Sequence, residues 1–445
     1  MKIIATIGPA SENHKKFNSI FRYADIIRLN GSHNNLTWHK KIIDQIKRLN
    51  PNATILFDIP GVKPRTLNSE IIAIKKNEEV LFYFKNKIKT ISTKSIQISN
   101  QIPKTKKIEK YFSIDDGKYI FKKISSNNNY IIGKSNSSFL LKPQKGLNII
   151  GGIYDDRKQS IKYINFINKI KSFNINAIGL SYIQNPDIIK NIRNKFKNFL
   201  IISKIENYQG LKNVNNICIK SDAVMIDRGD LAAEIGLENM YEAISTITQT
   251  AKKNYVPVIM ATENFTSMLN NNQPSKSDLI SIEHAKSLGT DCIMLSEETA
   301  TNKNYLRTLS WLYKSIGNKI EKKFFSEEIS VVDVDHYLKS MQLLVVSKKG
   351  YIFEKTIKRF SNTYPIYMTN DKFSYYKSTF YKNYKSVFVN NLSRGKFDLH
   401  YLYNLIKHYK KLIFKNHNKA ILIHAVFPKK FSRANSLTII DKKDF

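Results

Sequence analysis

The feature that most constrains the fold is a recurring apolar run that ends abruptly at polar residues. Each run is short and rich in β-branched residues, which is typical of a buried strand. The intervals between the later runs each hold a segment with helical periodicity. This alternation indicates successive βα units and a parallel sheet. The runs lie at Ile26-Ile27, 54–57, 177–180, 200–202, 223–226, 257–260 and 292–295.

A closed (β/α)8 barrel, the TIM barrel, is our leading interpretation, although a doubly wound open sheet would also fit the pattern. In either fold the carboxyl ends of the strands meet at one edge, where active sites are built. Polar residues that end the runs should therefore gather there. In the later runs these residues are Ser181, Lys204, Asp230, Thr262 and Ser296.

The βα rhythm is interrupted twice. Residues 67–149 carry short alternating stretches and the turn sequence Asp115-Asp116-Gly117, which predicts an inserted small β domain. After residue 328 the polar run ends stop, while 342–346 and 419–423 have the character of strands. We predict a barrel catalytic domain of residues 1–66 and 150–328, the inserted domain of 67–149, and a reduced C-terminal α/β domain of 329–445.

The formal net charge of +36 comes from 72 Lys and Arg against 36 Asp and Glu. Such an excess often accompanies nucleic-acid binding. Here the lysines are spread along the chain with many Asn, Ile and Tyr, so we interpret them as compositional drift and do not expect a nucleic-acid partner.

The sequence shows no feature of a membrane or secreted protein. No run reaches the ~18 apolar residues of a spanning helix, and the opening residues leave no room for a signal peptide before Gly8-Pro9. The two cysteines, Cys218 and Cys292, cannot build a disulfide framework. We therefore expect an unprocessed, soluble, cytoplasmic protein.

The polar run ends combine side chains suited to phosphate chemistry. The carboxylates of Glu206 and Asp230 suit Mg²⁺, which binds oxygen ligands. Lys204, Arg28 and Arg65 suit an anionic phosphoryl group. Phosphoryl transfer needs positioning and charge neutralisation more than covalent help. The residues alone predict Mg²⁺-dependent chemistry on a phosphorylated or carboxylated small molecule.

Two segments, 202–207 (ISKIEN) and 225–231 (MIDRGDL), closely resemble the central motifs of the pyruvate kinase family. The resemblance covers most of residues 2–300. It implies an enzyme that transfers a phosphoryl group from phosphoenolpyruvate to ADP on a (β/α)8 barrel, with residues 67–149 as a mobile β-barrel lid. Further matching segments, in the family's order, are Thr6–Ser11, Arg28–His33, Asp115–Gly117, Lys145–Asn148, Val258–Thr262 and Asp291–Ser296.

The resemblance implies catalytic and metal-binding roles. Glu206 and Asp230 would ligate the Mg²⁺ that bridges the phosphoryl group and the enolate oxygen. Lys204 would neutralise charge on the phosphoryl group in flight. Thr262 would lie near the face where the enolate is protonated.

The resemblance also implies two sets of binding residues. Arg28 would grip phosphate, and backbone N–H groups near Gly229 and Asp230 would hold the substrate carboxylate. The implied substrate-binding set is Arg28, Lys204, Gly229, Asp230 and Thr262, and the nucleotide-binding set is His33, Arg65 and Lys145.

The segment 57–66 departs from the family's usual sequence. The family's monovalent-cation site would involve Asn30, Ser32 and Asp58, but Ile59 lacks the hydroxyl of the usual threonine. Lys63 replaces a usual glutamate, and family members with lysine there tend not to need K⁺. We hypothesise that the Lys63 ammonium replaces the ion, so that K⁺ is not required.

Other departures bear on rate and regulation. Asp227 replaces a usual alanine, Glu263 a usual glutamine and Glu297 a usual glycine, so we expect effects on catalytic efficiency. The C-terminal region barely resembles the family, and its activator loop cannot be located, so we predict no activation by sugar phosphates. Relatives are commonly tetramers, and we expect a homo-oligomer, either a tetramer or a dimer.

Two alternatives to an active pyruvate kinase stay open. One is a degenerate, non-catalytic paralogue that binds nucleotide or RNA, although the retained set of Lys204, Glu206, Asp230 and Thr262 favours the enzyme. The other is a barrel enzyme that uses an Mg²⁺-bound enolate without ADP. Lys145 and the inserted domain argue against the latter.

Overall fold

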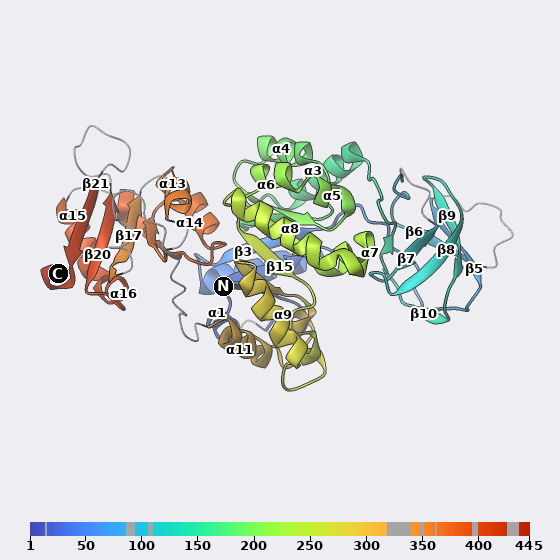
Figure 1. Cartoon of the computed structure of the whole chain (residues 1–445), viewed down its shortest axis with the longest axis horizontal. Helices are drawn as coiled ribbons and strands as arrows, with labels where there is room; N and C mark the ends of the chain where they lie inside the picture. The colour runs from blue at the N-terminus through green and yellow to red at the C-terminus, as the bar shows by residue number, and fades with distance from the viewer. Residues whose placement is uncertain are drawn as a thin grey trace.

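The structure, a computed structural model, describes residues 1–13, 16–85, 94–105, 110–317, 340–347, 351–360, 363–393, 399–424 and 436–445. Three parts follow one another along the long axis of the molecule (Figure 1). A strand barrel lies in the middle, a small β sheet lies at one end, and a C-terminal sheet with its helices lies at the other.

The central part is a closed barrel of eight strands, each parallel to its neighbours. This confirms the predicted (β/α)8 barrel and excludes the open sheet. The strands are almost wholly buried, because one face fills the barrel and the other meets the helices. Around the barrel the order is β1 (Lys2–Thr6), β16 (Cys292–Leu295), β15 (Val258–Ala261), β14 (Ala223–Asp227), β13 (Leu200–Ile205), β12 (Ala177–Leu180), β3 (Thr54–Ile59) and β2 (Ile26–Asn30).

Helices surround the barrel and bury one apolar face against it. The helix α2 (Leu36–Leu49) begins at Asn35, whose side chain accepts a hydrogen bond from the Trp38 N–H at 2.9 Å. The helix α8 (Met240–Lys253) matches the helical segment expected from the sequence. The other helices and 3-10 turns here are α1 (Phe17–Phe21), α3 (Asp156–Ile170), α4 (Pro186–Lys195), α5 (Tyr208–Lys212), α6 (Val214–Lys220), α7 (Arg228–Ile235), η2 (Leu237–Asn239), η3 (Thr266–Leu269), α9 (Lys276–Ser287), α10 (Glu297–Ala300) and α11 (Tyr305–Ile316).

The inserted region forms a six-stranded sheet around an aromatic core. The rings of Phe112 and Phe121 stack at 5.1 Å, and Phe82 meets both edge-on. The predicted β-barrel stays a prediction: the six strands form one sheet, and isolated bridges of Arg65 with Gly146, directly before β11, and of Thr66 with Ile98, in β6, link its two edges. The sheet order is β11 (Leu147–Asn148), β7 (Tyr111–Ile114), β8 (Tyr119–Ser126), β9 (Tyr130–Ser135), β5 (Glu79–Phe84) and β6 (Lys94–Ile98), beside the pair β4 (Ile72–Ile74) and β10 (Phe139–Leu141).

The C-terminal part is a five-stranded mixed sheet with helices, as predicted. It packs against the amino ends of the barrel strands, where Phe380 joins a core cluster with Cys292. The predicted boundary between residues 328 and 329 lies outside the described residues, and the other domain boundaries stay predictions. The sheet order is β19 (Lys385–Phe388), β18 (Ile366–Thr369), β17 (Gln342–Ser347), β20 (Lys419–His424) and antiparallel β21 (Ser436–Asp441), with α13 (Tyr351–Arg359), α14 (Lys372–Ser378), η4 (Asn390–Ser393), α15 (Leu399–His408), α16 (Lys410–Ile413) and η5 (Lys442–Asp444).

Candidate active site

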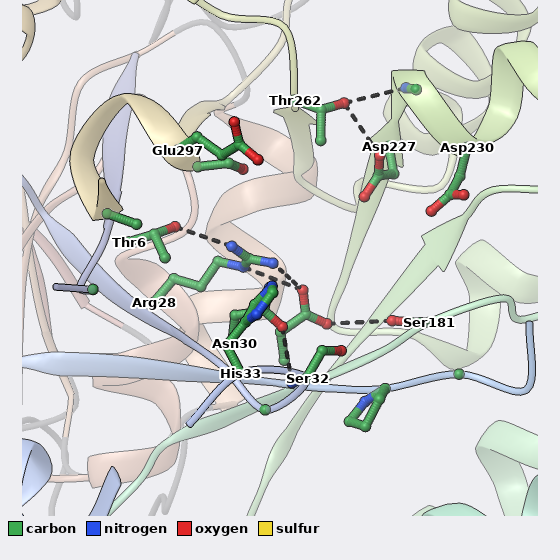
Figure 2. A pocket seen from close by; sticks show the side chains of 18 of the residues that line it. Thr6, Arg28, Asn30, Ser32, His33, Ser181, Asp227, Asp230, Thr262 and Glu297 are labelled. Carbon is green, nitrogen blue, oxygen red and sulfur yellow. Dashed lines mark hydrogen bonds and ion pairs between the residues drawn. The ribbon is translucent and has the colours of Figure 1, made fainter. Parts of the chain in front are cut away.

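A cavity of about 840 Å³ opens at the carboxyl ends of the barrel strands, where the sequence pattern placed the polar residues. Figure 2 shows part of its lining, with side chains from several strand ends pointing inward. Most of the predicted site residues contribute to the lining. They are Arg28, Asn30, Ser32, His33, Asp58, Lys63, Arg65, Lys204, Glu206, Gly229, Asp230 and Thr262.

A buried ion-pair network occupies the centre of this cavity. The Arg28 guanidinium donates to Asp58 Oδ2 through Nε at 3.2 Å and through Nη2 at 2.7 Å. The Lys204 ammonium lies 3.3 Å from the same oxygen. Burial alone would raise the pKa of Asp58, but the charges of Lys204 and Arg28 hold it below its ordinary value. Asp58 is therefore a carboxylate already paired with two cations.

Lys204 is 5% exposed and lies among three carboxylates. Its ammonium is 2.7 Å from Glu206, 3.2 Å from Asp227 and 3.3 Å from Asp58. Burial would lower the pKa of Lys204, yet these three charges raise it well above its ordinary value. A permanently charged ammonium is thus held at the cavity centre.

Three of the carboxylates could together hold a metal ion. One oxygen each from Glu206, Asp227 and Asp230 lies within 4.8 Å of the others. Burial first, and then the charges of Asp227 and Asp230, raise the pKa of Glu206 well above its ordinary value against the opposing Lys204. Hard oxygen donors crowded in this way suit a divalent cation such as Mg²⁺. The sequence prediction named Glu206 and Asp230 and missed Asp227.

Lys63 connects this carboxylate set to the inserted sheet. Its ammonium contacts the carboxylate of Asp230 and lies 2.9 Å from that of Asp116, in the turn between β7 and β8. Although burial acts the other way, the charges of Asp230 and Asp116 raise the pKa of Lys63. Its positive charge is therefore held between the barrel and the inserted domain.

Thr262 follows β15 with a left-handed backbone, φ 54°, which is uncommon for a threonine. This conformation brings its hydroxyl beside the start of α7. The backbone N–H groups of Arg228 and Gly229 donate to Thr262 Oγ1 at 3.0 and 3.3 Å. The hydroxyl also donates to Asp227 Oδ1 at 3.1 Å, as the dashed line between them in Figure 2 shows.

The residues predicted to bind nucleotide are distributed over a wider area. Arg65 and His33 line the cavity, and the Arg65 guanidinium donates to the carbonyl of Gln144 at 3.1 Å. Lys145 is not part of the cavity lining. Its ammonium lies 2.5 Å from Asp115 in the inserted domain. Of the predicted nucleotide residues, the structure brings two to the cavity and places the third outside it.

The residues predicted for a monovalent cation lie together at the ends of β2 and β3, but they already have partners. The Asn30 side chain accepts from the Ser32 N–H at 3.1 Å, whereas Asp58 pairs with Arg28 and Lys204. Lys63 contacts Asp230 and Asp116 rather than the Asp58 carboxylate. The charge of Lys63 therefore lies beside Asp230, where the sequence alone could not place it.

Comparison with known proteins decides the family. The sequence profile described as "Pyruvate kinase, barrel domain" matches residues 1–308. The chain belongs to the pyruvate kinase family. A pyruvate kinase of Encephalitozoon cuniculi is 30% identical over 319 residues, which cover 70% of this chain and 73% of that protein.

Other pyruvate kinases show how far the similarity extends. That of Borreliella burgdorferi is 28% identical over 72% of this chain and 68% of its own length. That of Staphylococcus saprophyticus is 32% identical over 67% of this chain and 53% of its own, so the chain spans about half the length of this relative. The crystal structure of a pyruvate kinase from Cryptosporidium parvum shares the fold, with a TM-score of 0.78 at 23% identity, covering 99% of this chain and 95% of that one.

Two side chains in this pyruvate kinase family member have contacts that the sequence did not reveal. The Tyr182 hydroxyl donates to Asp230 Oδ1 at 2.9 Å, and the φ of this residue is 61°. The wholly buried Glu234 lies 3.5 Å from the Asn148 side-chain nitrogen. Burial, together with the charge of Asp230, raises the pKa of Glu234 to about 8 against the opposing charge of Lys63. Tyr182 directly follows Ser181, so the strand-end rule could have found it.

Proposed function

We propose that this chain transfers the phosphoryl group of phosphoenolpyruvate to ADP, giving pyruvate and ATP, with Mg²⁺ as cofactor. The observation that carries the proposal is the Lys204 ammonium, buried among three carboxylates at the carboxyl ends of a pyruvate kinase barrel. The cavity around it, about 840 Å³, is large enough for small phosphorylated substrates.

In this proposal Lys204 stabilises the charge that spreads over the phosphoryl oxygens during transfer. The phosphorus–oxygen bond to the enolate breaks while an oxygen of the ADP β-phosphate bonds to phosphorus. Arg28 lies next to Lys204 through their shared partner Asp58 and contributes a second positive charge. Charges fixed in advance in a cavity need little reorganisation when the reaction occurs.

Glu206 and Asp230 are the residues that would hold the magnesium ion, and the carboxylate of Asp227 lies beside them. Bound there, the ion would supply charge neutralisation for the phosphoryl and enolate oxygens. Tyr182 donates to Asp230 and thereby orients one of these carboxylates.

Gly229 and Asp230 lie in the first turn of α7, where the helix start favours an anion, and we assign the substrate carboxylate to this helix start. Thr262 lies beside the same turn, within hydrogen-bonding distance of the Gly229 N–H, and we assign it to the protonation of the enolate. Arg65 and His33, with Lys145 from the inserted domain, are assigned to the nucleotide phosphates.

Potassium independence is part of the proposal. Asp58, one of the expected cation ligands, already pairs with Arg28 and Lys204, and Lys63 brings a tethered positive charge to Asp230. The test is turnover in potassium chloride against tetramethylammonium chloride at equal ionic strength. Equal turnover is expected, and a strong K⁺ activation curve would refute this part.

We also propose a cytoplasmic homo-oligomer. Large apolar side chains stay exposed on and beside α8 and α9: Leu237 is 81% exposed, Tyr241 68% and Ile280 69%. Such a patch is suited to covering by a second copy of the chain.

Among the described residues, no helix combines the length and apolar character needed to cross a membrane.

The experiment that tests the function is a coupled assay of pyruvate formation with phosphoenolpyruvate, ADP and Mg²⁺. We expect turnover that requires all three. The second candidate, a non-catalytic nucleic-acid binder, is motivated by the net charge of +36. It would show no turnover together with tight, steeply salt-dependent binding of RNA.

A further inference from the structure

Asp227 joins two residues to which we assign different halves of the reaction. It ends β14 at the cavity wall and is 7% exposed. One carboxylate oxygen, Oδ2, lies 3.2 Å from the Lys204 ammonium. The other, Oδ1, accepts from the Thr262 hydroxyl at 3.1 Å. A single side chain therefore bridges the ammonium and the hydroxyl.

The hydrogen bonds of Thr262 show what this bridge does. A hydroxyl offers two acceptor lone pairs and one hydrogen. The N–H groups of Arg228 and Gly229 occupy the lone pairs, at 3.0 and 3.3 Å. The hydrogen can be directed to Asp227 Oδ1 at 3.1 Å or to the Ala261 carbonyl at 2.8 Å. A carboxylate forms the stronger hydrogen bond of the two, so Asp227 controls the direction of the hydroxyl.

We propose that Asp227 is a positioning residue for protonation of the enolate, acting through Thr262. In that step an oxygen lone pair of the enolate re-forms the C2 carbonyl, the C2–C3 π bond breaks, and its electron pair bonds C3 to a proton that comes from solvent. Asp227 holds the Thr262 hydroxyl in one orientation and fixes its separation from Lys204. The inference rests on the proposed function.

A role as metal ligand is the competing assignment, since Asp227 lies with Glu206 and Asp230. The contacts favour positioning, because Asp227 is the one of these three carboxylates that accepts a hydrogen bond from the Thr262 hydroxyl, while its other oxygen faces Lys204. The two roles differ in what they change. Loss of a positioning residue slows enolate protonation alone. Loss of a metal ligand raises the Mg²⁺ requirement of both phosphoryl transfer and enolate protonation.

The test measures the two steps separately in the full chain. Rapid-quench single turnovers with phosphoenolpyruvate, ADP and Mg²⁺ give the rate of ATP formation. Proton NMR in D₂O with pyruvate, ATP and Mg²⁺ gives the exchange of the pyruvate methyl protons. The variants are Asp227→Ala and Asp227→Asn, with Asp44→Asn on the exposed surface of α2 as the matched control. If Asp227→Ala does not fold, Asp227→Ser replaces it. The serine side chain is one bond shorter than that of aspartate.

We expect Asp227→Ala to slow exchange by about 10- to 100-fold, and ATP formation by no more than about threefold, as for loss of one charged hydrogen bond. Asp227→Asn keeps an oxygen acceptor for Thr262 but loses the charge, so its exchange should lie between that of the wild type and that of Asp227→Ala. The control should change neither rate, and the Mg²⁺ concentration for half-maximal rate should stay the same in all variants.

The inference alone would be overturned by equal losses in both steps, by equal losses in the Asn and Ala variants, or by a Mg²⁺ requirement raised about tenfold or more, as expected for a lost ligand. Unchanged exchange in Asp227→Ala would overturn it as well. A wild-type protein that forms no ATP would overturn the proposed function and this inference together.

Discussion

At the scale of single residues, the site depends on the pairing of buried carboxylates with buried cations. Asp58, Glu206, Asp227 and Asp230 share the cavity with Arg28, Lys204 and Lys63. Buried carboxylates are costly unless they are paired. In this cavity the carboxylates outnumber the lysines and arginines, and three of the carboxylates form the group of oxygens suited to a divalent ion.

Lys204→Met tests the central cation of this set. We expect turnover to fall by at least ~10²–10³, because a preorganised charge at the transferring group is lost. The matched control is Lys40→Met, at an exposed lysine of α2 that pairs with Asp44. Circular dichroism must accompany the assay, since the change leaves three carboxylates with less compensation. Turnover within tenfold of the wild type would contradict the role of Lys204.

Glu234→Gln tests the buried carboxyl behind the site. Its pKa rises on folding from 4.5 to about 8, so between these values the folded chain holds a proton that the unfolded chain lacks. Stability that depends on this proton falls as pH rises, by up to ~1.4 kcal/mol per pH unit. Glutamine does not titrate. The melting temperature of the variant minus that of the wild type should therefore be larger at pH 8 than at pH 5. The same difference at both pH values would contradict the raised pKa of Glu234.

At the scale of elements, the start of α7 connects the fold to the substrate. Gly229 lines the cavity, and a Cβ built there meets no atom within 4 Å. Gly229→Ala therefore places a methyl group in the open space assigned to the substrate carboxylate. We expect KM for phosphoenolpyruvate to rise about tenfold, as for loss of about 1.4 kcal/mol of binding. Melting temperature should not fall, because alanine suits a helix better than glycine. An unchanged KM would contradict the assignment of the substrate carboxylate to this position.

The elements also show what the sequence could predict. The barrel strands were found because a buried strand leaves a local signal in length and branching, and parallel strand ends must share one edge. The residues Lys204, Glu206 and Asp230 could be grouped for that reason. Their roles stay predictions.

Contacts between parts distant in sequence left no local signal. Lys63 meets Asp116 across 53 positions, and only the path of the inserted domain determines that contact. The left-handed backbones of Tyr182 and Thr262 are likewise set by their surroundings and not by their residue types. The bridges of Arg65 with Gly146 and of Thr66 with Ile98 could not be predicted either, because strand pairing depends on partners far along the chain.

At the scale of the whole molecule, family resemblance and structural resemblance have different extents. The family profile stops at residue 308, yet the C. parvum fold covers 99% of this chain. The C-terminal sheet therefore shares the fold of that structure, whereas the matching profile describes the barrel domain alone. We expect fructose 1,6-bisphosphate to leave the phosphoenolpyruvate saturation curve unchanged. A curve shifted to lower substrate concentration would show that an activator site persists.

The measurement that tests the central claim most directly is transfer of ³²P from labelled phosphoenolpyruvate to ADP by the purified chain with Mg²⁺. Lys204→Met, purified in the same way, controls for enzyme carried over from the expression host. We predict labelled ATP and an equal amount of pyruvate from the wild type, and at least ~10²-fold less from the variant. Equal labelling by both proteins, or none by the wild type, would contradict the assignment of phosphoryl transfer to this cavity.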